Sequence, residues 1–176
     1  MWNLNGRSVL SVGLSDVKPL IDHYTKLLKN LFGDKLVSVV VFGSVVRNEA
    51  KADSDIDVLI VAEDLPEDIG SRYKLTSKLR RELRKSRVYR ELMERNMPRL
   101  ISEIILTPEE VSRHPPILLD ITVEGKILYD KGGFLKRELE EIRKRLRELG
   151  ARRVKGKRGW YWILKPDIKF GEVIEI

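Results

Sequence analysis

The stretch that decides the fold runs from Val37 to Val61 and reads VSVVVFGSVVRNEAKADSDIDVLIV. A first apolar run ends at Gly43 and Ser44, and a second apolar run contains Asp55 and Asp57 near its start. Apolar runs bounded by glycine are typical of buried strands, and Gly-Ser is typical of a turn that opens a helix. The stretch predicts strands over 36–42 and 56–62, joined by a short helix or turn over 44–50.

The two aspartates predict a metal site. They are two positions apart, so on an extended strand both carboxylates leave the same face of the sheet. Two carboxylates this close repel each other, and a buried pair is costly without a cation between them. The alternative is that Asp55 only caps the strand and Asp57 faces water, but the apolar residues around them mark the strand as interior. We therefore expect a divalent metal here, with the turn at Gly43 and Ser44 as a phosphate-binding site.

A third carboxylate stands in the next predicted strand. Residues 100–106 read LISEIIL, and Glu103 is the only charge among them. A lone carboxylate in such a strand is more often a solvent-facing residue of an edge strand. Next to the aspartate pair, however, it would complete a set of oxygen ligands suited to Mg²⁺.

The rest of the chain indicates one α/β core with a C-terminal extension. We assign residues 1–130 to the core domain and residues 131–176 to a helix and a basic, aromatic extension packed on it. Residues 1–14 form either a loose arm or an edge strand, and residues 117–123 form either a helix or a strand. The remaining patterns predict helices over 15–33, 66–96 with a break near Ser86, 108–113 and 134–149, and strands over 126–129 and within 151–176.

Composition excludes several functions. The 176 residues contain no Cys and two His, which excludes thiol chemistry, disulfides and multi-histidine metal sites. The amino terminus is too short and polar for a signal segment, and no window is apolar enough to span a membrane. We expect a cytoplasmic protein, and the dominance of Lys, Arg and Glu together with the absence of Gln fits a thermophilic source.

Positive charge is concentrated in two segments. The chain carries a net charge of +7, and 35% of its residues are charged. Residues 72–90 and residues 143–158 are both strongly basic. They suit RNA or an acidic protein partner, or they are solvated helix faces. The aromatic residues of the tail could stack on bases, but we favour their packing a C-terminal hairpin onto the core. The apolar seam of helix 134–149 suits core packing or a homo-oligomer interface.

The central stretch resembles the signature of the DNA polymerase β-like nucleotidyltransferase superfamily. In that signature a hydrophobic residue, Gly and Ser are followed, after ten residues, by Asp-hydrophobic-Asp. The string is similar in particular to the minimal nucleotidyltransferases of prokaryotes, and the specific resemblance covers about residues 35–107. It implies a polymerase β-like fold, α/β (α+β), with a mixed sheet flanked by helices.

The resemblance also implies roles for these residues. Gly43 and Ser44 would hold the triphosphate of ATP or another NTP, and Asp55 and Asp57 would ligate two Mg²⁺ ions. Glu103 would be the third carboxylate, a metal ligand and a base toward the acceptor hydroxyl.

For Glu103 and Arg47 an alternative to the implied role remains. No fixed spacing anchors Glu103 as the third carboxylate, and Asp120 competes with it. Arg47 would contact phosphate or would form a structural pair with Asp53 or Glu49.

The implied reaction is attack of a hydroxyl on the α-phosphorus, with pyrophosphate leaving. AMP from ATP is the expected donor group. The resemblance suggests as acceptor either a HEPN-type toxin protein or a small molecule such as an aminoglycoside. The alternative is a non-catalytic module that binds nucleic acid or a protein on the same fold.

Overall fold

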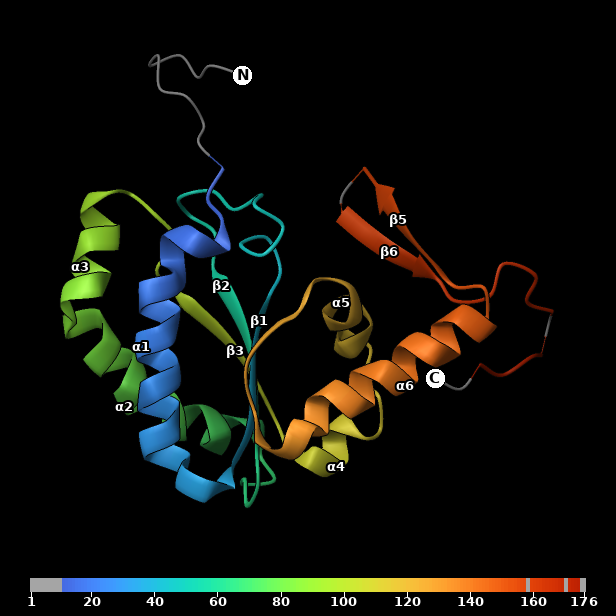
Figure 1. The fold of residues 1–176 in the computed structure, drawn as a ribbon, viewed down its shortest axis with the longest axis horizontal. Coiled ribbons are helices and arrows are strands. Elements are labelled where there is room, and N and C mark those ends of the chain that lie inside the picture. The colour runs from blue at the N-terminus through green and yellow to red at the C-terminus, as the bar shows by residue number, and fades with distance from the viewer. Residues whose placement is uncertain (1–10, 158, 170, 175–176) are drawn as a thin grey trace, which may run out of the picture.

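The protein is described by a computed structural model, which covers residues 11–157, 159–169 and 171–174. A four-stranded sheet with the order β3-β2-β1-β4 forms its centre (Figure 1). Strand β1 pairs antiparallel with β2 and β4, whereas β2 and β3 run parallel, so the sheet is mixed as predicted. Its strands are β1 Leu36–Phe42, β2 Ile56–Ala62, β3 Ile101–Leu106 and β4 Lys126–Asp130.

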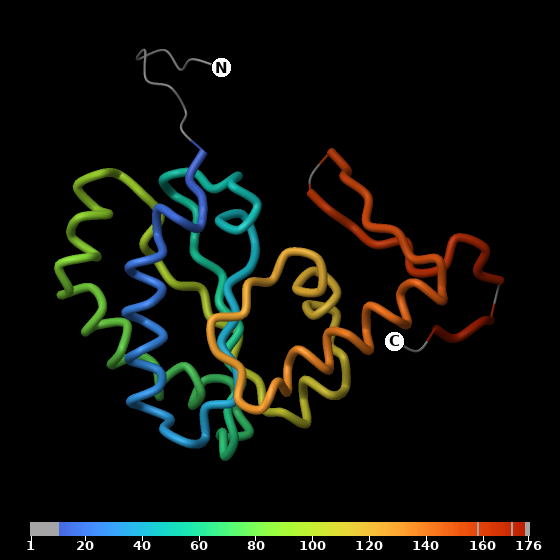
Figure 2. The backbone as a smooth tube through the Cα atoms, in the orientation of Figure 1, coloured from blue at the N-terminus to red at the C-terminus, as the bar shows by residue number. Residues whose placement is uncertain are grey.

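Helices cover both faces of this sheet because the inner strands are apolar on both sides. Alternate residues of β1, such as Val39 and Val40, enter two separate apolar clusters. One cluster lies under α1 Leu14–Phe32, α2 Ile69–Lys85 and α3 Arg87–Glu94, and the other under α4 Pro108–Val111, α5 Ile117–Glu124 and α6 Phe134–Glu148. Figure 2 follows the chain from α1 into β1 and β2, back to the first layer for α2 and α3, and through β3 into the second layer.

Most predicted elements are confirmed, and the differences have local causes. The long helix predicted over 66–96 begins only at Ile69, since Asp68 caps it by accepting a hydrogen bond from the Ser71 N–H at 2.8 Å. It is broken at Ser86, whose hydroxyl caps the next helix. Residues 44–50 form hydrogen-bonded turns, and residues 117–123, which the sequence left open, are helical. Of the predicted amino-terminal arm, residues 1–10 lie outside the described residues.

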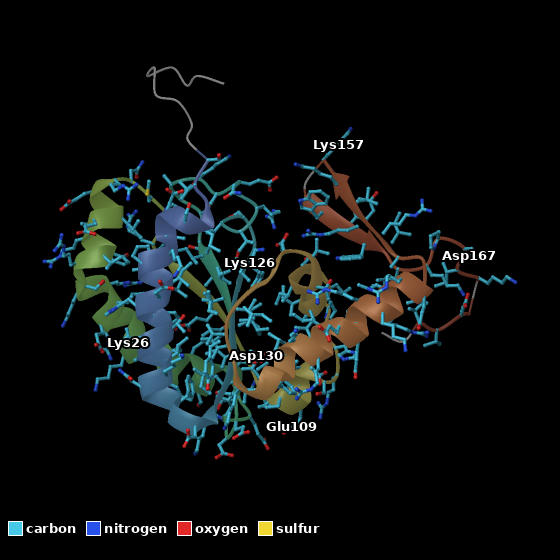
Figure 3. The ribbon with its side chains drawn as sticks, viewed as in Figure 1. Lys26, Glu109, Lys126, Asp130, Lys157 and Asp167 are labelled. Atoms are coloured by element: carbon cyan, nitrogen blue, oxygen red, sulfur yellow. The ribbon has the colours of Figure 1, made fainter. Side chains whose placement is uncertain are left out.

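The C-terminal extension contains a helix that belongs to the core and a hairpin that projects from it. Leu135, Leu139, Ile142 and Leu146 of α6 are buried in the second cluster, so its seam serves core packing and offers no homo-oligomer interface. After α6 the chain forms the antiparallel hairpin of β5 Arg152–Gly156 and β6 Gly159–Ile163. Lys157 lies at the tip of this hairpin (Figure 3). The domain boundary near residue 130 stays a prediction.

Two short 3-10 helices complete the described elements, η1 Gly33–Lys35 and η2 Lys131–Gly133. Among the described residues, no helix combines the length and the apolar character that a membrane crossing needs.

Candidate active site

Asp57 lies at the rim of the sheet, between the ends of the two strands that flank β2. The register pairs it with Phe42 of β1, directly before Gly43, and with Ser102 of β3. Its side chain shares a face with Leu59 and therefore points toward the layer of α5 and α6. The strand pairing thus brings Asp57 and the turn at Gly43 together, as the sequence predicts.

The turn after β1 depends on glycine. Gly43 has φ +82, in the left-handed region, and a Cβ atom at this position would collide with Oδ2 of Asp57. The carbonyl of Gly43 accepts hydrogen bonds from the N–H groups of Val46 and Arg47 at 3.1 and 3.2 Å. Within the described part of the chain, neither the N–H groups of Ser44 and Val45 nor the Ser44 hydroxyl donates a hydrogen bond. The turn therefore presents unpaired donors beside a carboxylate.

Asp57 is half-buried, whereas Asp55 is exposed and lies directly before the first residue of β2. Burial raises the pKa of Asp57 above its ordinary value, and the negative charges of Asp55 and Glu124 raise it further. A hydrogen bond from Ser102 and the charge of Arg47 oppose this shift. The balance disfavours the ionised carboxylate, so a cation bound between the aspartates would relieve the repulsion.

Glu124, which no motif in the sequence marks as a site residue, contacts three groups of the site. This buried carboxylate at the end of α5 accepts a hydrogen bond from the Gly43 N–H at 3.0 Å. It also pairs with Arg47 at 2.6 Å and with Arg153 of the hairpin at 2.9 Å. Glu124 therefore fixes the turn, and the only sequence signal for it was a Glu directly before the Gly that ends a helix.

Glu103 does not join the aspartates, which contradicts the prediction for it. The parallel register pairs Glu103 with Val58, and Val58 faces the layer of α1 and α2, on the opposite side of the sheet from Asp57. The Glu103 carboxylate is almost fully buried there and accepts hydrogen bonds from Tyr24, Thr76 and Arg80. The prediction was wrong by one position in the strand, because the residue on the Asp57 face is Ser102.

Asp120 and Arg47 have structural partners. Asp120 lies 3.0 Å from the Nε of Arg153 and accepts a hydrogen bond from the indole of Trp162, also at 3.0 Å. Arg47 pairs with Glu49 at 2.9 Å, which confirms one of the two structural pairs considered for it. Its guanidinium is about one quarter exposed and lies beside the turn.

A separate group of metal-binding residue types lies on other elements. His114, Glu138 and Glu141 approach one another between the end of α4 and α6. His114 and Glu138 already contact each other at 3.2 Å. This group shares no residue with the aspartate site.

Cationic side chains of the β5–β6 hairpin attach it to the rest of the protein. Besides the contacts of Arg153, Lys155 lies 3.4 Å from Glu49 in the loop after the turn. Trp160 lies under both cations, with its ring centre 4.9 Å from Arg153 and 5.4 Å from Lys155. Part of the basic segment 143–158 therefore serves contacts within the chain, and the hairpin stands beside the turn (Figure 1).

Comparison with known proteins gives the family. The family model "Polymerase beta, Nucleotidyltransferase" matches residues 25–132. "Putative protein adenylyltransferase MJ1305" of Methanocaldococcus jannaschii is 32% identical over 126 residues, which cover 70% of this chain and 79% of that protein. "Protein adenylyltransferase MntA" of Thermococcus cleftensis is 40% identical over 53 residues, which cover 30% of this chain and 52% of that protein.

Among solved structures, a crystal structure of a toxin–antitoxin with AMP-PNP is similar, with a TM-score of 0.47 and 20% identity over 73% of this chain and 91% of that one. The family match spans the sheet, the turn at Gly43 and both aspartates. This chain therefore belongs to the polymerase beta nucleotidyltransferase family and is a nucleotidyltransferase.

Proposed function

We propose that the protein transfers AMP from Mg²⁺-bound ATP to a hydroxyl group of a partner protein, with release of pyrophosphate. The observation that carries this proposal is the close approach of the Asp57 carboxylate, whose pKa is raised, to a turn with unpaired N–H donors. The two relatives named above as protein adenylyltransferases support a protein as acceptor and AMP as the transferred group. Following the resemblance to minimal nucleotidyltransferases, we propose a HEPN-type protein as the partner.

The residues present fit Mg²⁺ as the metal. Asp55 and Asp57 supply carboxylate oxygens, which are the ligands that Mg²⁺ prefers. Burial and, after it, the charge of Asp55 raise the pKa of Asp57, and a bound cation would favour its ionised form. When bound, Mg²⁺ would neutralise charge on the attacking and leaving oxygens during the displacement. Ser102 stands where a third carboxylate was expected, and the other carboxylate whose charge acts on Asp57 is Glu124, which is held by the Gly43 N–H, Arg47 and Arg153.

The turn and its neighbours would hold the triphosphate. The N–H groups of Ser44 and Val45 form a concave set of donors of the kind that binds phosphate, and the Ser44 hydroxyl adds another donor. Arg47 adds positive charge beside them. Since Glu124 fixes both the Gly43 N–H and Arg47, these groups are oriented before the nucleotide arrives, which lowers the barrier for transfer.

Incubation with α-labelled ATP, Mg²⁺ and a cell lysate tests the proposal. The wild-type protein should label a protein band, the label should be AMP on a hydroxyl side chain by mass spectrometry, and Asp57→Asn should abolish it. Asp53→Asn is the matched control, because Asp53 is an exposed aspartate of the same loop. The absence of labelled protein with ATP, or full labelling by Asp57→Asn, would contradict the proposal.

A further inference from the structure

The β5–β6 hairpin meets the surroundings of the turn at two acidic side chains. Glu124 of α5 accepts a hydrogen bond from the Gly43 N–H at 3.0 Å, and Arg153 of the hairpin lies 2.9 Å from the same carboxylate. Glu49, in the loop after the turn, lies 3.4 Å from Lys155 of the hairpin. The hairpin follows the part of the chain that matches the family model, so these two cations reach the site from outside the matched core.

The two cations leave the hairpin on one face. Strand pairing sets Arg153 opposite Trp162 and Lys155 opposite Trp160. Residues two positions apart on a strand share a face, and so do residues directly opposite each other in an antiparallel pair. The ring centre of Trp160 lies 4.9 Å from Arg153 and 5.4 Å from Lys155. Trp160 therefore restrains both cations on the face that meets the loop after β1.

The hairpin lies on the same side of the sheet as the Asp57 carboxylate. Asp57 points toward the layer of α5 and α6, and Arg153 contacts two carboxylates of α5, Asp120 and Glu124. In Figure 1 the hairpin projects past α5 toward the loop after β1. A phosphate held between Asp57 and the turn would therefore lie on the side of the sheet from which the hairpin cations approach.

The balance of charge near the turn depends on the hairpin. Within the described residues, Glu49 and Glu124 pair with Arg47 of the core and with the two hairpin cations. Without the hairpin, two carboxylates would share one cation beside the turn, and a triphosphate would meet an excess of negative charge. Arg153 and Lys155 change this balance to three positive charges against two negative ones. The two aspartates, which would hold Mg²⁺, stand outside this balance.

The two hairpin cations differ in burial. The Arg153 side chain is 11% exposed, whereas the Lys155 side chain is 64% exposed and has a longer contact with Glu49. An exposed pair of this kind is weak, so Lys155 can turn to a ligand at little cost. We infer that the hairpin completes the nucleotide site, with Lys155 binding the triphosphate beside Arg47. Arg153 is a positioning residue, which acts by neutralising Glu124. This inference rests on the proposed function.

Calorimetry of the full chain with Mg²⁺ and AMP-PNP tests the inference. Lys155→Gln and Arg153→Gln should each raise the Kd about fivefold or more. The difference between Lys155→Gln and wild type should shrink as salt is raised, because the lost contact is between exposed charges. Arg153→Lys should recover part of the affinity, since it restores a positive charge beside Glu124.

The matched controls are Arg152→Gln and Lys157→Gln. Both residues are exposed cations of the same hairpin, and neither forms an ion pair with a residue that the structure describes. Each control should change the Kd by less than about twofold, since the charge it removes is distant from the turn. Thermal unfolding in EDTA checks the fold. Lys155→Gln should unfold at the wild-type midpoint, so it tests the inference even if Arg153→Gln is unstable.

Inorganic triphosphate with Mg²⁺, used as a second probe, separates contacts to phosphate from contacts to the nucleoside. Lys155→Gln should weaken the binding of both probes by the same factor. A loss with AMP-PNP alone would assign the hairpin to the base or the ribose and overturn the inference.

Wild-type affinity in Lys155→Gln, or an equal loss in the controls, would also overturn the inference and leave the proposed function standing. If the wild-type protein does not bind Mg²⁺ with AMP-PNP, or if Asp57→Asn binds it equally well, the proposed function fails and the inference fails with it.

Discussion

Carboxylates on two neighbouring strands of this sheet have opposite surroundings. Asp57 on β2 faces other negative groups, and burial raises its pKa. Glu103 on β3 points to the other side of the sheet, where three donors, including the guanidinium of Arg80, surround it. The two residues are adjacent in register, since Glu103 pairs with Val58, the residue after Asp57.

The different surroundings of the two carboxylates indicate a structural role for Glu103 and a catalytic role for Asp57. A buried carboxylate with a cation and hydrogen-bond donors within the protein is already satisfied and stabilises its own surroundings. A half-buried carboxylate near other carboxylates, as Asp57 is, costs free energy when it ionises and gains from a bound cation. Activity should therefore depend on Asp57 and stability on Glu103.

The largest expected effect is on catalysis at β2. Asp57→Asn should lower AMP transfer by about 10³-fold or more, because it removes a metal ligand. It should not lower the free energy of unfolding of the metal-free protein, because the amide relieves charge repulsion. Initial rates with labelled ATP and urea unfolding in EDTA measure the two quantities. A normal rate in this variant would place the metal elsewhere, and Asp53→Asn should behave as wild type.

At β3 the expected effect is on the stability of the fold. Glu103→Gln should lower the free energy of unfolding by about 3 kcal/mol, because it leaves Arg80 without its buried counterion. At saturating acceptor the variant should keep kcat within about tenfold of wild type, since no metal ligand is lost. Urea unfolding and initial rates check both, with the exposed Glu82→Gln on α2 as control. A stable protein without activity would restore Glu103 as a metal ligand.

A smaller effect is expected where the hairpin meets the core. Arg153→Ala should lower the free energy of unfolding by about 1–2 kcal/mol, since Glu124 keeps Arg47 and the Gly43 N–H as partners. Neighbouring Arg152 is exposed, so Arg152→Ala should change it by less than about 0.5 kcal/mol. Chemical denaturation of both variants measures the difference. Equal values would mean that the contacts of Arg153 do not hold the hairpin.

The smallest expected effect is on the pH dependence of the free energy of unfolding. Glu110 and Asp57 should change it in opposite directions. The hydrogen bonds from Arg72 lower the pKa of Glu110, so this pair stabilises the fold above the ordinary carboxyl pKa, and the gain is lost as pH falls through the lowered value. Glu110→Gln should therefore cost about 1 kcal/mol or less at pH 7 and little near pH 3.

Asp57 has a raised pKa, so its ionisation destabilises the fold as pH rises through the raised value. In EDTA, Asp57→Asn should therefore stabilise the protein at pH 7 and have little effect near pH 3. Urea unfolding at both pH values measures the two differences. The same sign of pH dependence in Asp57→Asn and Glu110→Gln would contradict the comparison between compensated and uncompensated carboxylates.

The sequence predicted the strands of this site well, because their signals are local. Both bounds of β1 and β2 follow from apolar runs between polar segments, and Gly43 is required by a clash that the Gly-Ser motif anticipates. The meeting of Gly43 with Asp57 follows from the pairing of two strands that are consecutive in the sequence.

The errors lie where strand register or distant segments decide the outcome. A shift of one position in β3 exchanges the two faces of the sheet, and no local pattern decides whether Ser102 or Glu103 lies on the face of Asp57. Glu124 and Arg153 reach the site from α5 and from the hairpin, and no local pattern marks residues that meet only through tertiary packing.

Thermal unfolding of wild type, Asp57→Asn and Glu103→Gln, each with EDTA and with Mg²⁺ plus AMP-PNP, tests the central claim most directly. A ligand that binds only the folded state raises the midpoint in proportion to its binding free energy. The account predicts a rise in wild type, no rise in Asp57→Asn, and in Glu103→Gln a lower starting midpoint with an undiminished rise. A rise that is lost in Glu103→Gln and kept in Asp57→Asn would contradict it.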